Sequence, residues 1–247
     1  PGVATPGVAT PAAAAPLRLR GHILLAEDGI DNQRLIGAFL GSVGLTHEAV
    51  DNGSSAVELA ASGRFDLVLM DIRMPVMDGV TATGLLRAQG FGKPIVALTA
   101  DLMQGDAARH AAAGFDRSIG KPVDFAALSE AIALLLGQAA PAAADARAAI
   151  DGLDEIRAWF NASLAPRLTE LAALVDSGAW KQAAHLAHQL RGAGGSFGYP
   201  GLSRCARVLE TAADQGDAGA VRAALDDLLA LEELRELGAG AVAWPAQ

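Results

Sequence analysis

The chain has 247 residues, enough for two ordinary domains, and its composition is 51% hydrophobic but only 4% aromatic. A core of Ala, Leu and Val favours closely packed helices, and a net charge of -9 argues against nucleic acid as a partner. The single cysteine, Cys205, excludes an internal disulfide framework and suits a reducing compartment, so we expect a cytoplasmic location.

The first residues, 1–20, are rich in Pro and Ala and are predicted to form a linker without a core. The chain begins at Pro1 rather than Met, which suggests a piece of a longer protein. No apolar run reaches the roughly 18 residues that a membrane span requires. We therefore expect no membrane contact by this piece.

Short apolar runs alternate with helical patterns over residues 21–137. The predicted strands are 22–26, 46–50, 66–70, 94–98 and 116–119. The predicted helices are 31–43, 54–62, 80–89, 102–113 and 125–136. This alternation is typical of an α/β domain with a doubly wound, five-stranded parallel sheet covered on both faces.

A second linker, rich in Ala, is predicted over 138–150, and no strand pattern follows it. Helical periods run over 153–175, 180–197, 200–215 and 218–237, separated by short turns. Four helices joined in this way predict an all-α domain, an antiparallel four-helix bundle over 151–237, with 238–247 as a tail.

Five polar residues stand where the predicted strands end. In chain order they are Glu27, Asp28, Asp71, Thr99 and Lys121. Because carboxyl ends of parallel strands share one edge of the sheet, we expect these residues together; the alternative, merely solvated acids, fits a single position better than all five. Close carboxylates need a neutralising cation, and hard oxygen ligands suit Mg²⁺. An aspartate there can attack phosphorus and form an acyl phosphate.

The stretches ILLAED, LVLMDIRMPVMDG, IVALTA and IGKP occur in this order over residues 21–137, which resembles the receiver domain of two-component response regulators. The resemblance implies a flavodoxin-like sheet with Asp71 as the phosphoacceptor. The implied Mg²⁺ ligands are Glu27, Asp28, Asp71 and the backbone carbonyl of Arg73. Thr99 and Lys121 would contact the phosphoryl oxygens. The sequence departs from the family at Ser118, where receivers often carry an aromatic switch residue.

The helical pattern 180–197 places His188 on an outward stripe, with Gly192 and Gly195 on the following turns. Glycine inside a helix costs about 1 kcal/mol relative to alanine, so a compensating gain is expected. The functional gain is clearance, because another protein's active-site rim can then reach an exposed His188. Arg191 can neutralise a phosphoryl group on that ring. The alternative is that the helix frays at Gly192 and leaves an ordinary surface histidine.

The stretch HQLRGAGGSFG resembles the signature of histidine-containing phosphotransfer domains, with Arg191 at a position where that family has lysine. This resemblance covers residues 151–237 and implies that His188 is the second phosphoacceptor. Since the attacking imidazole must be neutral, transfer should slow as the pH drops toward about 5.5.

A receiver followed by a phosphotransfer domain resembles the carboxy-terminal part of a bacterial hybrid sensor histidine kinase, whose parent protein could be membrane-anchored. The implied function is a phosphorelay between Asp71 and His188. Its implied partners are an upstream kinase core, in this or another chain, and a downstream receiver that docks at His188. No stretch reads as an ATP-binding kinase core, so enzyme activity of this piece stays open. The rivals are an aspartate-nucleophile phosphatase, against which Arg73 argues, and a regulatory docking module with one phosphosite unused.

Overall fold

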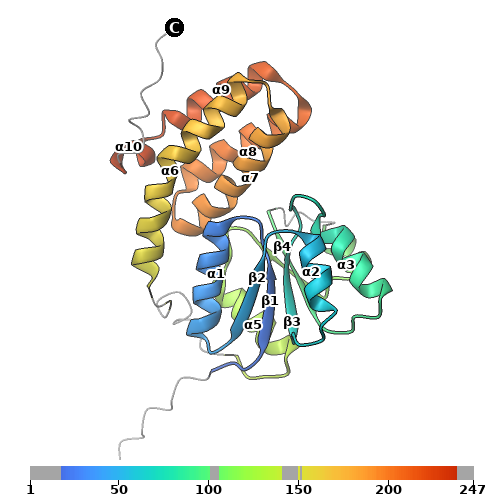
Figure 1. Ribbon diagram of the computed structural model, residues 1–247. Helices are drawn as coiled ribbons and strands as arrows, with labels where there is room; N and C mark the ends of the chain where they lie inside the picture. Colours follow the sequence, from blue (N-terminus) through green and yellow to red (C-terminus); the bar gives the residue numbers. More distant parts are fainter. Residues whose placement is uncertain (1–17, 101–105, 141–149, 151, 238–247) are drawn as a thin grey trace, which may run out of the picture.

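The computed structural model describes residues 18–100, 106–140, 150 and 152–237 (Figure 1). Four predicted segments therefore lie wholly or partly outside the described residues. They are the linker 1–20 up to residue 17, the start of the helix predicted over 102–113, most of the linker 138–150, and the tail 238–247.

The first half contains one parallel sheet of five strands in the order β2-β1-β3-β4-β5, as predicted. The strands are β1 (His22–Ala26), β2 (Thr46–Val50), β3 (Leu67–Asp71), β4 (Ile95–Thr99) and β5 (Arg117–Gly120). The last three strands each lie one residue later than predicted, so Asp71 ends its strand rather than following it. The strand order reverses between β1 and β3, which is the point where flavodoxin-like sheets place their ligand sites.

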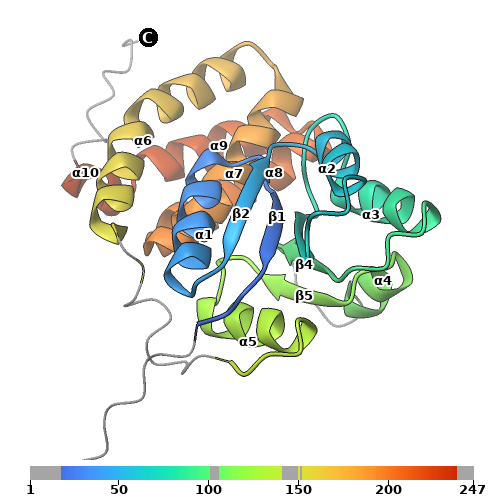
Figure 2. The same ribbon diagram turned by 60° about the horizontal axis from the view of Figure 1, so that its bottom comes forward.

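Helices cover both faces of this sheet, and alternate strand residues feed two cores. Figure 2 shows α1 (Ile30–Ser42) and α5 (Phe125–Leu135) on one side. On the other side lie α2 (Gly53–Ala60), α3 (Gly79–Ala88) and α4 (Asp106–Ala112). In β3, Leu67 and Leu69 join the core under α1 and α5, whereas Val68 and Met70 join the opposite core. The doubly wound fold is therefore confirmed.

The second half is helical, and its first four helices contact one another in a ring, α6 to α7 to α8 to α9 and back to α6. They are α6 (Leu153–Asp176), α7 (Trp180–Phe197), α8 (Pro200–Gln215) and α9 (Ala218–Leu229), followed by the short α10 (Glu232–Glu236). The short turns between successive helices make neighbours antiparallel, which is the predicted bundle. None of the helices in the described part of the chain is long and apolar enough to cross a membrane.

The prediction of one helix over 218–237 is wrong, because the helix is interrupted between α9 and α10. Leu231 is extended (φ -58°, ψ 130°) and starts a second, short helix. This turn brings the carboxylate of Glu233 to the start of α8, where it accepts hydrogen bonds from the backbone N–H groups of Gly201 (3.0 Å) and Leu202 (3.2 Å). Carboxylates at a helix N-terminus satisfy otherwise unpaired N–H groups.

The bundle rests on the sheet domain at the edge where the strands end. Figure 1 shows α6 and α7 above α1, and α1 contacts both of these helices. Buried apolar residues of α1 and α5 and of α6 to α9 form one continuous cluster. The two halves are thus packed against each other, an arrangement that no local sequence pattern predicts.

Candidate functional site

The predicted acidic cluster is present at the carboxyl edge of the sheet. Glu27 and Asp28 follow β1, Asp71 ends β3, and ligand atoms of all three carboxylates lie within 4.8 Å of one another. Glu27 and Asp71 are each only 1% exposed. The burial of these acids in one place is what a cation site requires, and it is not what solvated acids at strand ends would look like.

Lys121, which follows β5, crosses this cluster and pairs with two of its acids. Its Nζ lies 2.6 Å from Oδ2 of Asp71 and 2.7 Å from Oε2 of Glu27. Burial alone would lower the pKa of Lys121. The neighbouring charges of Asp71 and Glu27 outweigh this effect and raise the pKa of Lys121 above its usual range. The ammonium group is therefore fixed in its charged form beside Asp71.

One ammonium does not balance three carboxylates, and their pKa values reflect the excess negative charge. Burial, opposed by Lys121 and assisted by Glu27 and Asp28, raises the pKa of Asp71 to about 7. Burial and the charge of Glu27 also raise the pKa of Asp28, whose buried Oδ1 receives no hydrogen bond within the described residues. Hard oxygen donors carrying two uncompensated charges fit a divalent cation such as Mg²⁺.

The loop after β3 returns tightly to the site because of a glycine. A Cβ on Gly79 would lie 2.0 Å from the carbonyl oxygen of Asp71, so no larger residue fits. Asp78 starts α3 by accepting a hydrogen bond from Thr81 N–H at 2.7 Å. Arg73 N–H donates to Oδ1 of Asp71 at 3.1 Å, which leaves Oδ2 as the oxygen that faces the bundle.

His188 comes from α7 and points at this carboxylate. Its Nε2 lies 4.0 Å from Oδ2 of Asp71 and has no hydrogen-bond partner within the described residues. Its Nδ1 lies 2.8 Å from Oε1 of Glu210 on α8. Because an ionised carboxylate can only accept, Nδ1 carries the hydrogen and Nε2 presents its lone pair toward Asp71.

The prediction that His188 is exposed is wrong, because the residue is 6% exposed. The predicted inward and outward faces of its helix are otherwise correct: Ala187 and Leu190 are fully buried in the bundle. The sheet domain covers the outward face, so His188 lies between the two domains rather than inside the bundle. Burial first, then the charges of Lys121 and Arg73, lower the pKa of His188 to about 2.

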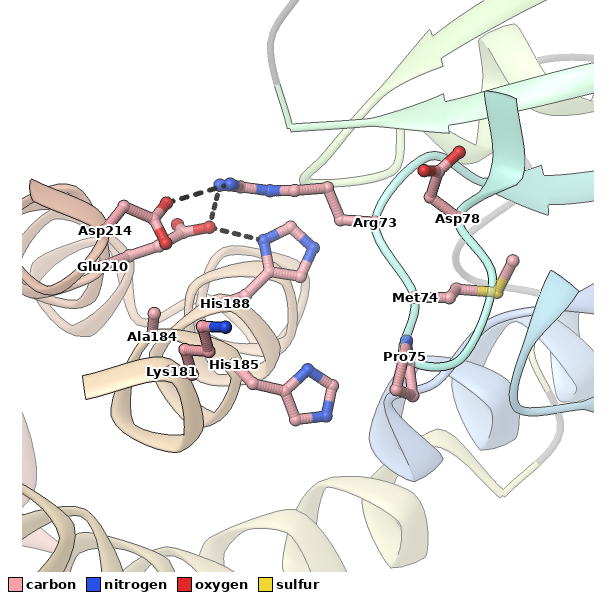
Figure 3. Close-up of a pocket in the computed structure, with 10 residues that line it drawn as sticks. All are labelled: Arg73, Met74, Pro75, Asp78, Lys181, Ala184, His185, His188, Glu210 and Asp214. Carbon is pink, nitrogen blue, oxygen red and sulfur yellow. Dashed lines mark hydrogen bonds and ion pairs between the residues drawn. The ribbon is translucent and has the colours of Figure 1, made fainter. Parts of the chain in front are cut away.

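Glu210 is the residue that sequence reasoning missed. It is 1% exposed and accepts hydrogen bonds from His188 Nδ1 and from Arg73 Nη2 (Figure 3). Arg191 Nη1 donates a third hydrogen bond to it at 3.0 Å. An acid at an inward position of an otherwise amphipathic helix was its only sequence signal. Glu210 thereby contacts side chains of both domains, among them His188.

The side chains of Arg191 and Arg73 both pair with Glu210. The guanidinium of Arg191 donates hydrogen bonds to Glu210 (3.0 Å) and to the carbonyl oxygen of Ala100 (2.6 Å). The side chain of Arg73 reaches Asp214 at 3.3 Å as well as Glu210. Whether the Arg73 carbonyl binds a cation stays a prediction.

Thr99 and Ser118, singled out in the sequence, lie on the last two strands of the sheet. Thr99 ends β4 and is 5% exposed. Ser118, at the expected switch position, has its hydroxyl 3.0 Å from Nδ1 of His110 on α4.

A cleft leads from solvent to His188. Figure 3 shows it between the loop carrying Arg73, Met74 and Pro75 and the helices α7 and α8. His185, one turn before His188, also lines the cleft, and its Nε2 lies 3.4 Å from Asp28. His185 thus flanks the site and is directed at a different carboxylate from His188.

Two glycines of α7, Gly192 and Gly195, leave room for close approach, as predicted. The groups that approach them come from the sheet domain of this chain and not from another protein. A Cβ on Gly195 would lie 2.9 Å from Pro122, and one on Gly192 would lie 3.0 Å from the side-chain nitrogen of Asn32. Gly194 instead faces Leu202 inside the bundle.

We therefore expect Gly195→Ala to stabilise the helical bundle but to weaken its docking, that is, its packing against the sheet domain of the same chain. Alanine should stabilise α7 by up to about 1 kcal/mol. The added methyl should weaken docking by about 1–3 kcal/mol, because it overlaps Pro122. Thermal unfolding and small-angle X-ray scattering of the full chain measure the two effects. The matched control is Gly84→Ala in α3, where an added Cβ meets nothing within 4 Å; equal scattering of the two variants would contradict this prediction.

Comparison with known proteins adds the following findings. The family model for the response regulator receiver domain matches residues 23–133, and the model for the Hpt domain matches residues 155–239. Two-component system protein A of Emericella nidulans is 39% identical over 107 residues, covering 42% of this chain and 16% of the relative. Hybrid signal transduction histidine kinase G of Dictyostelium discoideum is 41% identical over 107 residues, covering 41% of this chain and 3% of the relative.

Among solved structures, the receiver domain of sensor histidine kinase PA1611 from Pseudomonas aeruginosa PAO1 is 40% identical. The match covers 49% of this chain and all of that one, with a TM-score of 0.45. That structure has a magnesium ion coordinated in its active site cleft. The chain thus spans only a small part of the curated relatives named above.

Proposed function

Because the chain belongs to the two-component phosphorelay proteins, with a response regulator receiver domain followed by an Hpt domain, we propose that it passes a phosphoryl group between Asp71 and His188. The observation that carries this proposal is the buried Nε2 of His188, which lies 4.0 Å from Oδ2 of Asp71 and has no hydrogen-bond partner in the part of the chain that the structure describes. We take 21–137 and 151–237 as the extents of the two domains.

We further propose that Glu27, Asp28 and Asp71 hold Mg²⁺, with the Arg73 carbonyl as a fourth ligand. Their donor chemistry and excess negative charge support this choice. When bound, the ion would neutralise charge on the phosphoryl oxygens. Lys121 stands at 2.6 Å from Asp71 and supplies a second, permanent positive charge to the same oxygens.

The transfer breaks one bond and makes one. Nε2 of His188 attacks phosphorus in line with the acyl-phosphate oxygen, the N–P bond forms, and the carboxylate of Asp71 leaves. The imidazole gains positive charge as it attacks, and its Nδ1–H donates to Glu210 throughout. Glu210 therefore balances the charge that develops on the ring, while Thr99 lies at the end of β4 to contact the phosphoryl group.

The proposal is tested by following the full chain after addition of acetyl phosphate and Mg²⁺. We expect phosphate to appear first on Asp71 and then on His188, mapped by peptide mass spectrometry at successive times. Phosphate that remains on Asp71 alone would favour a docking module with an unused histidine. Rapid release of inorganic phosphate from added monoesters, without phosphate on His188, would favour a phosphatase.

Exchange with a partner needs the two domains to separate, because Asp71 and His188 are 1% and 6% exposed when docked. We propose that an upstream histidine kinase core loads Asp71 and that a partner receiver exchanges phosphate with His188. The docked form is then the state of internal transfer, and the separated form is the state of exchange.

Removing the charge of Glu210 should slow internal transfer. In Glu210→Gln the ring loses its charged acceptor, and Arg73 and Arg191 lose their shared partner. A buried charge-assisted hydrogen bond contributes about 1.5–3 kcal/mol, so we expect a rate about 10–150-fold lower with loading of Asp71 unchanged. The decay rate of phospho-Asp71 into phospho-His188 measures this. Asp214→Asn, which alters only the exposed partner of Arg73, is the control and should retain most of the rate.

Docking should depend on pH through His188. Burial and the neighbouring positive charges lower the pKa of this histidine to about 2 when docked. Without them we expect the ordinary imidazole pKa of about 6.5, so the separated state binds the proton more readily. The docking equilibrium therefore keeps its full strength above pH 6.5 and weakens as the pH falls. We expect the docking equilibrium constant to drop by about tenfold between pH 7.5 and 5.5 at saturating Mg²⁺. Transfer slows because fewer molecules are docked, and the docked ring itself stays neutral.

Scattering at each pH measures the docked fraction. His188→Gln, which cannot take up the proton, serves as the control and should show a much weaker dependence. Equal pH dependence in the two chains would contradict this account.

A further inference from the structure

A buried ion pair joins the domains away from the reacting atoms. Asp31, in the first turn of α1, is fully buried, and its Oδ2 pairs with Nη1 of Arg167 on α6. Next to it, the guanidinium of Arg34 stacks on the ring of Trp159 at 3.9 Å. The contact between α1 and α6 therefore carries two specific cross-domain interactions.

The carboxylate of Asp31 depends on the bundle for its partner. Burial raises the pKa of this carboxyl, and Arg167 opposes the shift most strongly, ahead of the Asp31 backbone N–H and the charge of Arg34. Within the described residues, Oδ1 has no hydrogen-bond partner, and Oδ2 accepts a hydrogen bond from Arg167. A buried charge left without its partner is strongly unfavourable. A bundle that offered no cation at this position would therefore dock poorly.

Several other contacts across the interface use groups that the proposed chemistry itself requires. His185 and Gln189 approach Asp28, and Gly192 approaches Lys121. Any receiver with the same phosphoryl chemistry presents these groups, so these contacts do not discriminate between receivers. Asp31 neither holds the cation nor touches Asp71, and a receiver can carry another residue there without loss of chemistry.

We propose that the Asp31–Arg167 pair is the specificity determinant that matches this Hpt domain to its receiver. The inference rests on the proposed phosphoryl transfer and deepens it by naming the chemical property of the partner. A receiver that exchanges with His188 presents a carboxylate at the start of its first helix, opposite Arg167. A receiver with a basic residue there is rejected, because two like charges would be buried together.

The test is a charge reversal in the full chain. Arg167→Asp and Asp31→Arg are each expected to lower the rate of phospho-His188 formation by more than about tenfold. The double variant, which restores opposite charges, should return to within about fivefold of the unaltered chain. Scattering should show the same order of docked fractions without any phosphoryl group present.

Three controls keep the result interpretable. Arg222→Asp breaks the exposed pair of Arg222 with Asp176 inside the bundle, the same chemical change away from the interface. Loading of Asp71 by acetyl phosphate reports that the receiver is folded in each variant. Asp31→Asn, which keeps the size and removes the charge, replaces Asp31→Arg if that variant does not fold, and its docking should still weaken.

Single variants that dock and transfer like the unaltered chain would overturn the proposal. A double variant no better than the worse single variant would overturn it too. The docked fraction could instead change with the charges at residues 31 and 167 while no phosphate ever appears on His188. That result would contradict the proposed transfer and still support the role of the Asp31–Arg167 pair in docking. The two failures are therefore distinguishable.

Discussion

Replacing His188 with glutamine is expected to stop the phosphoryl group at Asp71. The variant should load Asp71 from acetyl phosphate at the normal rate, because residue 188 is not one of the proposed cation ligands and Lys121 keeps its contact with Asp71. Transfer into the Hpt domain should fall by at least about 10⁴-fold, since removal of a nucleophile commonly costs that much or more. Peptide mapping of phosphate at successive times measures both steps.

His185→Gln is the matched comparison, because both histidines belong to α7 and line the same cleft. His185 lies 3.4 Å from Asp28, whereas His188 lies 4.0 Å from Asp71. We expect phosphate on the Hpt domain to persist in His185→Gln. The reverse pattern, in which His185→Gln loses that phosphate and His188→Gln keeps it, would assign the acceptor role to His185.

Replacing Asp71 with asparagine is expected to leave both domains without phosphate. Asparagine has nearly the same shape but is a far weaker nucleophile, so loading should fall by at least about 10⁴-fold. His188 should then stay empty as well, because it is filled through Asp71. Phosphate on His188 in this variant would show direct loading from acetyl phosphate and would contradict the order of the relay.

The same substitution should change stability in the opposite direction to function. The pKa of Asp71 is raised to about 7 in the fold, so its ionised form destabilises the folded state at higher pH. Without divalent cation at pH 8, Asp71→Asn should therefore unfold at a higher temperature than the unaltered chain. Excess Mg²⁺ should reduce the difference if the cation binds the carboxylate cluster. Sites that gather like charges often trade stability for function in this way.

The docked arrangement has a consequence for how the relay works. Because the receiver covers His188 through Lys121, Pro122 and the loop of Arg73, its own receiver and any partner receiver must compete for one face of the bundle. In the proposed relay, strong internal docking would then favour transfer between Asp71 and His188, and weak docking would favour exchange with partners. We expect the Asp31–Arg167 pair and the protonation of His188 to set this balance.

The strands, most helices and the acidic cluster could be predicted from sequence because each depends on local pattern. Alternating apolar runs define parallel strands, and the topology of such a sheet brings Asp71 and Lys121 to one edge whatever their separation along the chain. The clearance around His188 was also predictable, because Gly192 lies four residues after His188 and Gly195 three residues further on, spacings that share one face of a helix. The break at Leu231 was not, since it follows from the capping of α8 by Glu233.

Only the tertiary structure decided what surrounds His188. Glu210 lies 22 residues away on another helix, and Arg167 lies 136 residues from Asp31. Such pairs are set by how two finished domains pack, and helical or strand periodicity carries no information about packing across domains. For the same reason the sequence predicted an exposed histidine: the helix does turn His188 outward, and the receiver domain then covers it.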